Sequence, residues 1–107
     1  MVSKGFVCVY ITCRDAEEAR KISFALVEKK LVACANMVHE VDSVYRWNGK
    51  IHEEKEALIF AKTMKKHAKK ITEVVKGMHS YENPAILFYD VAEGSDEYLK
   101  WVEGETQ

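Results

Sequence analysis

The chain has 107 residues, of which 48% are hydrophobic and 31% charged, and its formal net charge is −1 at pH 7. This size suits one domain, so we expect residues 1–107 to fold as a single unit. The charge gives no general attraction to nucleic acid or to an anionic membrane surface. The longest apolar run, Phe6 to Ile11, is far shorter than the roughly 20 residues that cross a bilayer. We therefore expect a cytoplasmic protein with no membrane partner.

Three cysteines occur, at positions 8, 13 and 34, and none lies in a C-x-x-C spacing. An odd number in this arrangement predicts reduced thiols. Cys8 and Cys13 are five positions apart on a predicted strand, and an odd separation sends two side chains to opposite faces. We therefore interpret them as small core residues that do not share an ion.

The first half of the chain predicts a strand, a helix and an unusually long hairpin. Residues 6–13 are apolar enough for a buried strand, and Asp15 with Glu18 predicts the start of a helix that runs to about Lys30. Asn48-Gly49 then predicts a type I′ turn between two β-rich arms that span Cys34 to Thr63. Each arm has about 13 to 15 residues, against roughly 5 to 6 for a usual strand. Part of the hairpin must project beyond so small a domain.

The second half predicts a helix, a strand and a terminal helix. Apolar residues from Ile71 to Met78 recur at helical spacing, a loop follows at 79–84, and residues 86–91 read as a strand. A short helix begins near residues 94–96 and buries some of its apolar side chains. The resulting βαββαβ order with one extra helix is that of an α+β, ferredoxin-like fold.

The first and last strands are apolar on both faces, although two helices cover only one face of a sheet. Burying apolar surface stabilises a fold by about 25 cal/mol per Å². Aromatic side chains left in contact with water on the other face would therefore cost the fold several kcal/mol of stability. We therefore predict an obligate homo-oligomer that buries the uncovered face.

The chain resembles the CutA divalent-cation-tolerance proteins over nearly its whole length. The segments that carry the resemblance are Thr12, Asp15 to Glu18, Ala25 to Asn36, Ser43 to Ile51, Lys62-Thr63, His79 to Pro84 and Tyr98 to Trp101. The resemblance implies a homotrimer of ferredoxin-like subunits whose hairpins extend neighbouring sheets, with an architecture similar to the PII signalling proteins. It also implies a role in tolerance of copper and other divalent cations, without established catalysis.

The metal site that the resemblance implies is altered in this sequence. Ile11 and Met78 stand where some relatives have a cysteine and a histidine, and Ala85 replaces a glutamate. His79 remains, and it leads a loop that also contains Glu82. We therefore predict His79 and Glu82 as the metal pair, for Cu²⁺ or another divalent cation, and loop-anchoring hydrogen bonds are the alternative role of His79.

A ligand cleft between subunits is also predicted. Its candidate residues are Cys34, Tyr45, Trp47, Lys62, Tyr81 and Trp101. In this alternative the protein is a PII-like signalling trimer that binds a small anionic ligand at Lys62, or a protein partner, and has no metal role. Aromatic side chains equally serve packing between subunits, and Cys34 equally serves as a buried packing thiol.

Nucleic-acid binding and catalysis are not expected. The βαββαβ order is shared with RNA-recognition domains, but residues 51–56, in the region where such domains stack bases, are acidic at one end. His39, His52 and His67 show no metal-binding spacing, and no nucleophile has an assignable base.

Overall fold

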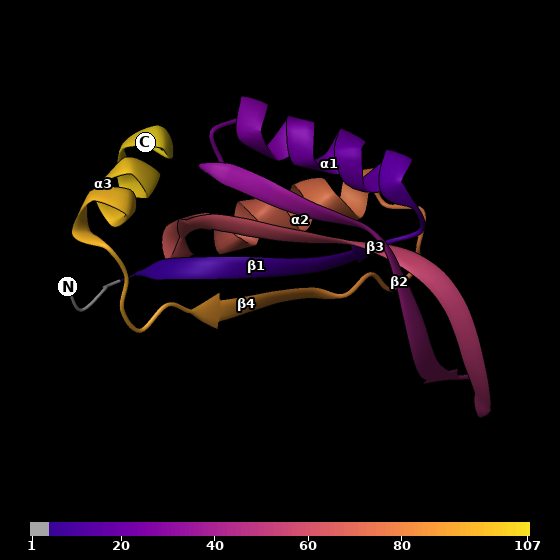
Figure 1. Cartoon of the computed structure of the whole chain (residues 1–107). Helices are drawn as coiled ribbons and strands as arrows, with labels where there is room; N and C mark the ends of the chain where they lie inside the picture. The colour runs from indigo at the N-terminus through magenta and orange to yellow at the C-terminus, as the bar shows by residue number, and fades with distance from the viewer. Residues whose placement is uncertain (1–4) are drawn as a thin grey trace.

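The computed structural model describes residues 5–107. Its elements are β1 (Phe6–Cys13), α1 (Ala16–Glu28), β2 (Cys34–Trp47), β3 (Lys50–Met64), a 3-10 turn (Lys65–His67), α2 (Ala68–Met78), β4 (Ile86–Asp90) and α3 (Asp96–Glu105). The predicted order of strands and helices is therefore confirmed. Figure 1 shows α1 and α2 above one face of the sheet, α3 at one end, and the β2–β3 hairpin curving away at the other.

The sheet has four antiparallel strands in the order β2-β3-β1-β4. Alternation along β1 decides where the core lies, because Val7, Val9, Ile11 and Cys13 are all buried. These side chains meet the apolar faces of the helices, which include Ile22, Leu26, Ile71 and Val75. The core thus lies between the sheet and the two helices.

The β1–α1 junction is held by two side chains. Asp15 caps α1 by accepting a hydrogen bond from the Glu18 amide at 2.9 Å. Glu18 reaches back and accepts a hydrogen bond from the Arg14 amide at 2.9 Å. The Asp15 contact satisfies an amide that the first turn of a helix leaves without a partner, so the predicted helix start is confirmed.

The hairpin turns where the sequence predicts. Asn48 and Gly49 have φ of 51° and 77°, the left-handed values that a type I′ turn needs. A β-bulge interrupts the register of β2 between Val38 and Val41. The chain measures 44 × 25 × 23 Å along its principal axes, which fits a hairpin that projects from the body.

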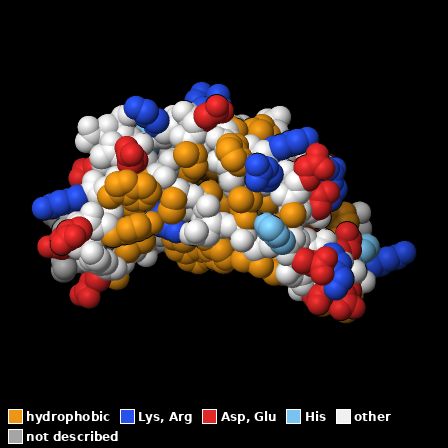
Figure 2. Space-filling model, turned by 45° about the horizontal axis from the view of Figure 1, so that its top comes forward, with side chains coloured by type: hydrophobic (Ala, Val, Ile, Leu, Met, Phe, Trp, Pro, Cys, Tyr) orange, Lys and Arg blue, Asp and Glu red, His pale blue; other side chains and the backbone are white. Residues whose placement is uncertain are grey.

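The face of the sheet opposite α1 and α2 is open in the single chain. Leu87 and Tyr89 on β4 are 48% and 54% exposed, and Tyr10 packs edge-on against Phe60 at a centroid distance of 5.4 Å. Figure 2, seen partly from the side of α1 and α2, shows charged side chains at the hairpin end and at the α3 end, with apolar patches between them. Two-sided apolar strands, inferred from the sequence, are thus present.

The terminal helix packs on the end of the core. Leu99 and Val102 are buried with Phe6 and Ala33, as the sequence predicts for some of its apolar residues. None of the helices within residues 5–107 is long and apolar enough to cross a bilayer.

Candidate functional site

A groove of about 630 Å³ lies on the open face. Its walls come from β1, the outer half of the hairpin and the loop after α2. The lining residues are Tyr10, Thr12, Ser43, Tyr45, Trp47, Glu56, Ser80, Tyr81, Glu82, Asn83 and Ala85. Four predicted site residues, Tyr45, Trp47, Tyr81 and Glu82, are therefore brought together here.

Hydrogen bonds from tyrosine hydroxyls to glutamate carboxylates connect the walls of the groove. The Tyr81 hydroxyl donates a hydrogen bond to Glu56 at 2.7 Å, and the Tyr45 hydroxyl donates to Glu54. Tyr45 also stacks on His52, with ring centroids 5.4 Å apart. Burial raises the pKa of Tyr81, and the negative charge of Glu56 raises it further. The phenol therefore stays protonated, and the groove has an acidic wall.

The other predicted cleft residues lie elsewhere on the open face. Cys34 Sγ is 3.4 Å from the Tyr98 hydroxyl, and Tyr98 packs against Trp101 with centroids 5.6 Å apart. Lys62 is paired in register with Cys34 and donates a hydrogen bond to the Asn36 side chain. These residues lie toward α3, so within one chain the predicted cleft is divided between the two ends of the sheet.

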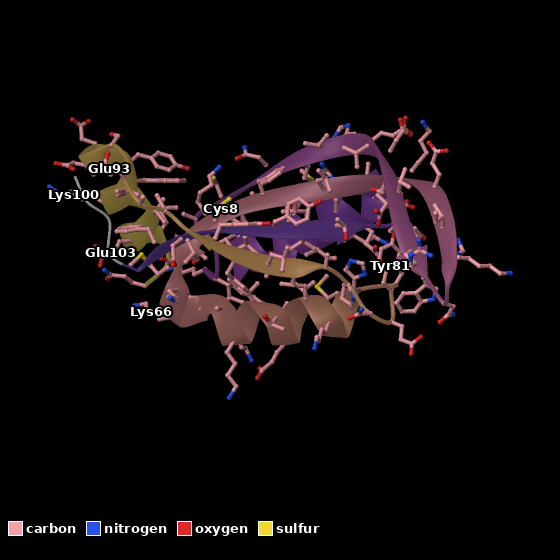
Figure 3. The ribbon with its side chains drawn as sticks, turned by 90° about the horizontal axis from the view of Figure 1, so that it is seen from below. Cys8, Lys66, Tyr81, Glu93, Lys100 and Glu103 are labelled. Atoms are coloured by element: carbon pink, nitrogen blue, oxygen red, sulfur yellow. The ribbon has the colours of Figure 1, made fainter. Side chains whose placement is uncertain are left out.

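The two cysteines of β1 lie on opposite faces, as their spacing predicts. Cys13 is fully buried under the helices, whereas Cys8 is half-buried and pairs with Lys62 on β3. Figure 3 shows Cys8 and Tyr81 well separated along the sheet, with Tyr81 beside the hairpin. Only Cys13 is therefore a residue of the helix-covered core.

His79 follows α2, and its imidazole is completely buried. Its Nδ1 accepts a hydrogen bond from the Tyr81 amide at 3.0 Å, and its Nε2 lies 2.7 Å from the Thr12 carbonyl oxygen. An amide only donates and a carbonyl only accepts, so the ring is the neutral tautomer with its proton on Nε2. His79 therefore anchors its loop to the end of β1, which is the alternative role that the sequence left open.

Glu18 joins the same network from α1. Besides the Arg14 amide, its carboxylate accepts the Ser80 amide at 2.9 Å, and its Oε1 lies 3.7 Å from His79 Nδ1. Burial acts to raise the pKa of Glu18, but the two amide donors outweigh it and the pKa is lowered. The carboxylate is ionised at neutral pH and ties the β1–α1 turn to the loop after α2.

Cys13, Glu18 and His79 form a group with one potential metal ligand each, and these three atoms lie within 4.8 Å of one another. Sequence reasoning found His79 but assigned Glu18 to helix capping and Cys13 to the core. Burial, assisted by the charge of Glu18, raises the pKa of the Cys13 thiol to about 12. Glu82, the predicted partner of His79, is exposed on the groove wall, and its role as a ligand stays a prediction.

These observations define a class of protein: a small α+β chain with a four-stranded antiparallel sheet, helices on one face, and a long hairpin beside an acidic, aromatic groove. The family model described as CutA1 divalent ion tolerance protein matches residues 7–105. The chain belongs to this family.

Relatives and solved structures agree with the match. The divalent-cation tolerance protein CutA of Thermus thermophilus is 43% identical over 98 residues, which cover 92% of this chain and 95% of the relative. A solved structure of the Thermus thermophilus protein has a TM-score of 0.93 at 41% identity and covers 95% of this chain and 99% of its own. The structure titled periplasmic divalent cation tolerance protein CutA from Archaeoglobus fulgidus also has a TM-score of 0.93, at 34% identity, with coverages of 95% and 99%.

Some relatives are longer than this chain. Protein CutA of Mus musculus is 37% identical over 98 residues, which cover 92% of this chain but only 55% of the mouse protein. The chain therefore spans little more than half of several curated relatives that it matches.

Proposed function

We propose that the protein acts in divalent-cation tolerance as a non-catalytic, cytoplasmic homotrimer with a ferredoxin-like subunit. The family match over residues 7–105 is the observation that carries the role, because the family is described as divalent ion tolerance proteins. The relatives' names describe tolerance and no reaction, which supports a non-catalytic role. The exposed apolar side chains of β4 support self-association, because copies of the chain would remove them from water, and the number of three copies rests on the family resemblance.

The proposal includes weak binding of Cu²⁺ or another divalent cation at His79. A thiolate, an imidazole and a carboxylate are ligand types that Zn²⁺ and Cu²⁺ accept, so Cys13, Glu18 and His79 fit such an ion in kind. An ion on His79 Nδ1 would compete with the Tyr81 amide for the same lone pair. It would also displace the Cys13 proton, so both effects limit the affinity. Glu82 remains the candidate that the sequence offers as a second ligand.

The test is a calorimetric titration of EDTA-treated, dialysed protein with Zn²⁺ and Cu²⁺. We expect one weak site per chain that His79→Ala removes, and His39→Ala serves as a control because His39 is exposed on the hairpin. Cys13→Ser, Glu18→Gln and Glu82→Gln then distinguish the buried group from the pair that the sequence predicts. Absence of binding, or equal binding by the wild type and a folded His79→Ala variant, would refute the metal site.

A further inference from the structure

We propose that the outer face of α1 docks an acidic peptide segment of a partner protein. An apolar side chain of the partner packs on Phe24, and a neighbouring carboxylate pairs with Arg20. This interaction goes beyond the proposed role in metal tolerance, and it involves neither the His79 group nor the open face of the sheet.

The first argument is the place of the patch in the fold. Figure 1 shows α1 on the face of the sheet opposite to the open one. The buried side chains of α1, among them Ile22 and Leu26, pack in the core against the sheet. Helical spacing therefore turns Phe24 outward, and its side chain is 57% exposed. Copies of the chain that cover the open face would leave this side chain in contact with solvent.

The second argument is the shape and composition of the patch. Val27 lies one turn beyond Phe24 on the same side of α1 and is 43% exposed. One turn before it, the Arg20 guanidinium lies 4.8 Å from the centroid of the Phe24 ring. Arg20 and Phe24, with Glu17 and Lys21, surround a hollow of about 350 Å³. Phenylalanine and arginine are both enriched at protein interfaces, and the hollow beside them can accept an apolar side chain.

The third argument is the free charge of Arg20. Lys21 pairs with Glu17 at 3.2 Å, whereas Arg20 makes no ion pair with any of residues 5–107. Its contact with the Phe24 ring uses the face of the guanidinium and leaves the N–H edge free. That edge matches a carboxylate, which it can bind through two parallel hydrogen bonds.

The fourth argument is the charge of the surrounding surface. The helix layer, which we define as residues 14–30 and 65–76, contains ten lysines and arginines and five aspartates and glutamates, a net charge of +5. The whole chain has a net charge of −1. This side of the molecule therefore attracts an acidic partner and repels a basic one.

Amide resonances of the full chain, labelled with nitrogen-15, give a direct test at constant ionic strength. The protein is titrated with the peptide EFEEL, with its uncharged analogue QFQQL, and with ESEES, which lacks the apolar side chains. All three peptides are acetylated and amidated. We expect saturable shifts on α1 with EFEEL, about fivefold weaker binding of QFQQL, and no binding of ESEES. Equal responses to EFEEL and either analogue, or no shift on α1, would overturn the proposal.

Matched variants locate the two contacts. Arg20→Gln is expected to weaken EFEEL binding about fivefold and to remove the preference over QFQQL, since one exposed ion pair is lost. Phe24→Gln should weaken the binding of both peptides about tenfold, through loss of an aromatic contact. Lys76→Gln makes the same charge change as Arg20→Gln on an exposed side chain of α2, and it should leave binding unchanged. Equal weakening by Arg20→Gln and Lys76→Gln would reduce the effect to overall charge and refute the site.

Light scattering distinguishes a peptide partner from the other possible occupant, a second copy of this chain. Phe24→Gln should leave the mass in solution equal to that of the wild type. A lower mass for this variant would show that copies of the chain cover Phe24, and it would overturn the proposal.

Discussion

The buried carboxylate of Glu18 links two segments that are distant in the sequence. It accepts backbone amides from Arg14 and Ser80, which are 66 positions apart in the chain, and it lies beside His79. The capping pattern in the sequence predicts that Glu18 turns back toward the start of α1, and there it accepts the amide of Arg14, one residue before the N-cap Asp15. The Ser80 contact depends on α2 returning to the end of β1, and no local pattern contains that information.

The lowered pKa of Glu18 predicts a stability that depends on pH. Because its pKa is lower in the folded than in the unfolded state, its contribution is complete above the ordinary value of 4.5 and is lost as pH falls through the folded value. Glu18→Gln should cost about 1–2 kcal/mol at pH 7, and the difference should shrink below pH 4.5. Urea unfolding of EDTA-treated protein at pH 7 and pH 3 measures this.

Glu17→Gln is the control for that measurement. Glu17 lies in the same turn, but it is exposed and pairs only with Lys21 at 3.2 Å. Its loss should cost less than about 0.5 kcal/mol at either pH. If the two variants were equally stable at pH 7, the Glu18 carboxylate would not hold the two loops together.

Element boundaries follow closely from the sequence, because the relevant signals are local. The hairpin turn is confirmed at Asn48-Gly49. The apolar spacing correctly predicts α2, in which Ile71 and Val75 are buried and Val74 is half-buried, whereas Met78 at its end is exposed. The predicted cleft residues lie at two ends of the sheet because they are far apart along the hairpin. Lys62 is twelve residues from the β3 partner of Trp47, about 40 Å along an extended strand. Extended geometry alone therefore argues against one cleft within a single chain.

Two glycines offer a paired test of backbone conformation. Gly49 has φ of 77° and Gly77 lies within α2, and an added Cβ would meet no atom within 4 Å at either position. Gly49→Ala should destabilise the fold by about 1 kcal/mol, because a left-handed backbone strains an L side chain. Gly77→Ala should stabilise it by about 0.5–1 kcal/mol. Urea midpoints at one protein concentration compare them, and a stabilising Gly49→Ala would contradict the turn geometry.

The whole molecule is asymmetric in what it exposes. Two helices cover one face of the sheet, whereas the other carries Tyr10, Phe60, Leu87 and Tyr89 with no cover from residues 5–107 apart from the hairpin and α3 at its ends. Alternation in β1 and β4 predicts this from the sequence. The number of copies that would cover the face is not encoded in that alternation, so the trimer comes from the family resemblance.

A charge on the open face should dissociate the proposed trimer. Leu87→Asp places a carboxylate on β4, where we expect burial between copies, and light scattering should then give a mass below three chains. Val27→Asp makes the same kind of change on α1, where Val27 is 43% exposed, and should leave the mass at three chains. A wild-type mass of one chain would contradict the proposed assembly.

The bulge in β2 decides which side chains the outer hairpin turns toward the groove. Val38 pairs with Leu58, but Val41 pairs with Glu56, so β2 gains one residue on β3 there. From Val41 onward, the odd-numbered residues of β2 therefore lie on the same side of the sheet as Glu56, and Tyr45 and Trp47 line the groove. If β2 instead continued in the register of Val38 without the bulge, Val44 and Arg46 would take these places, and an arginine would replace an aromatic ring beside the carboxylates. The chemical character of this surface thus depends on a single extra peptide unit.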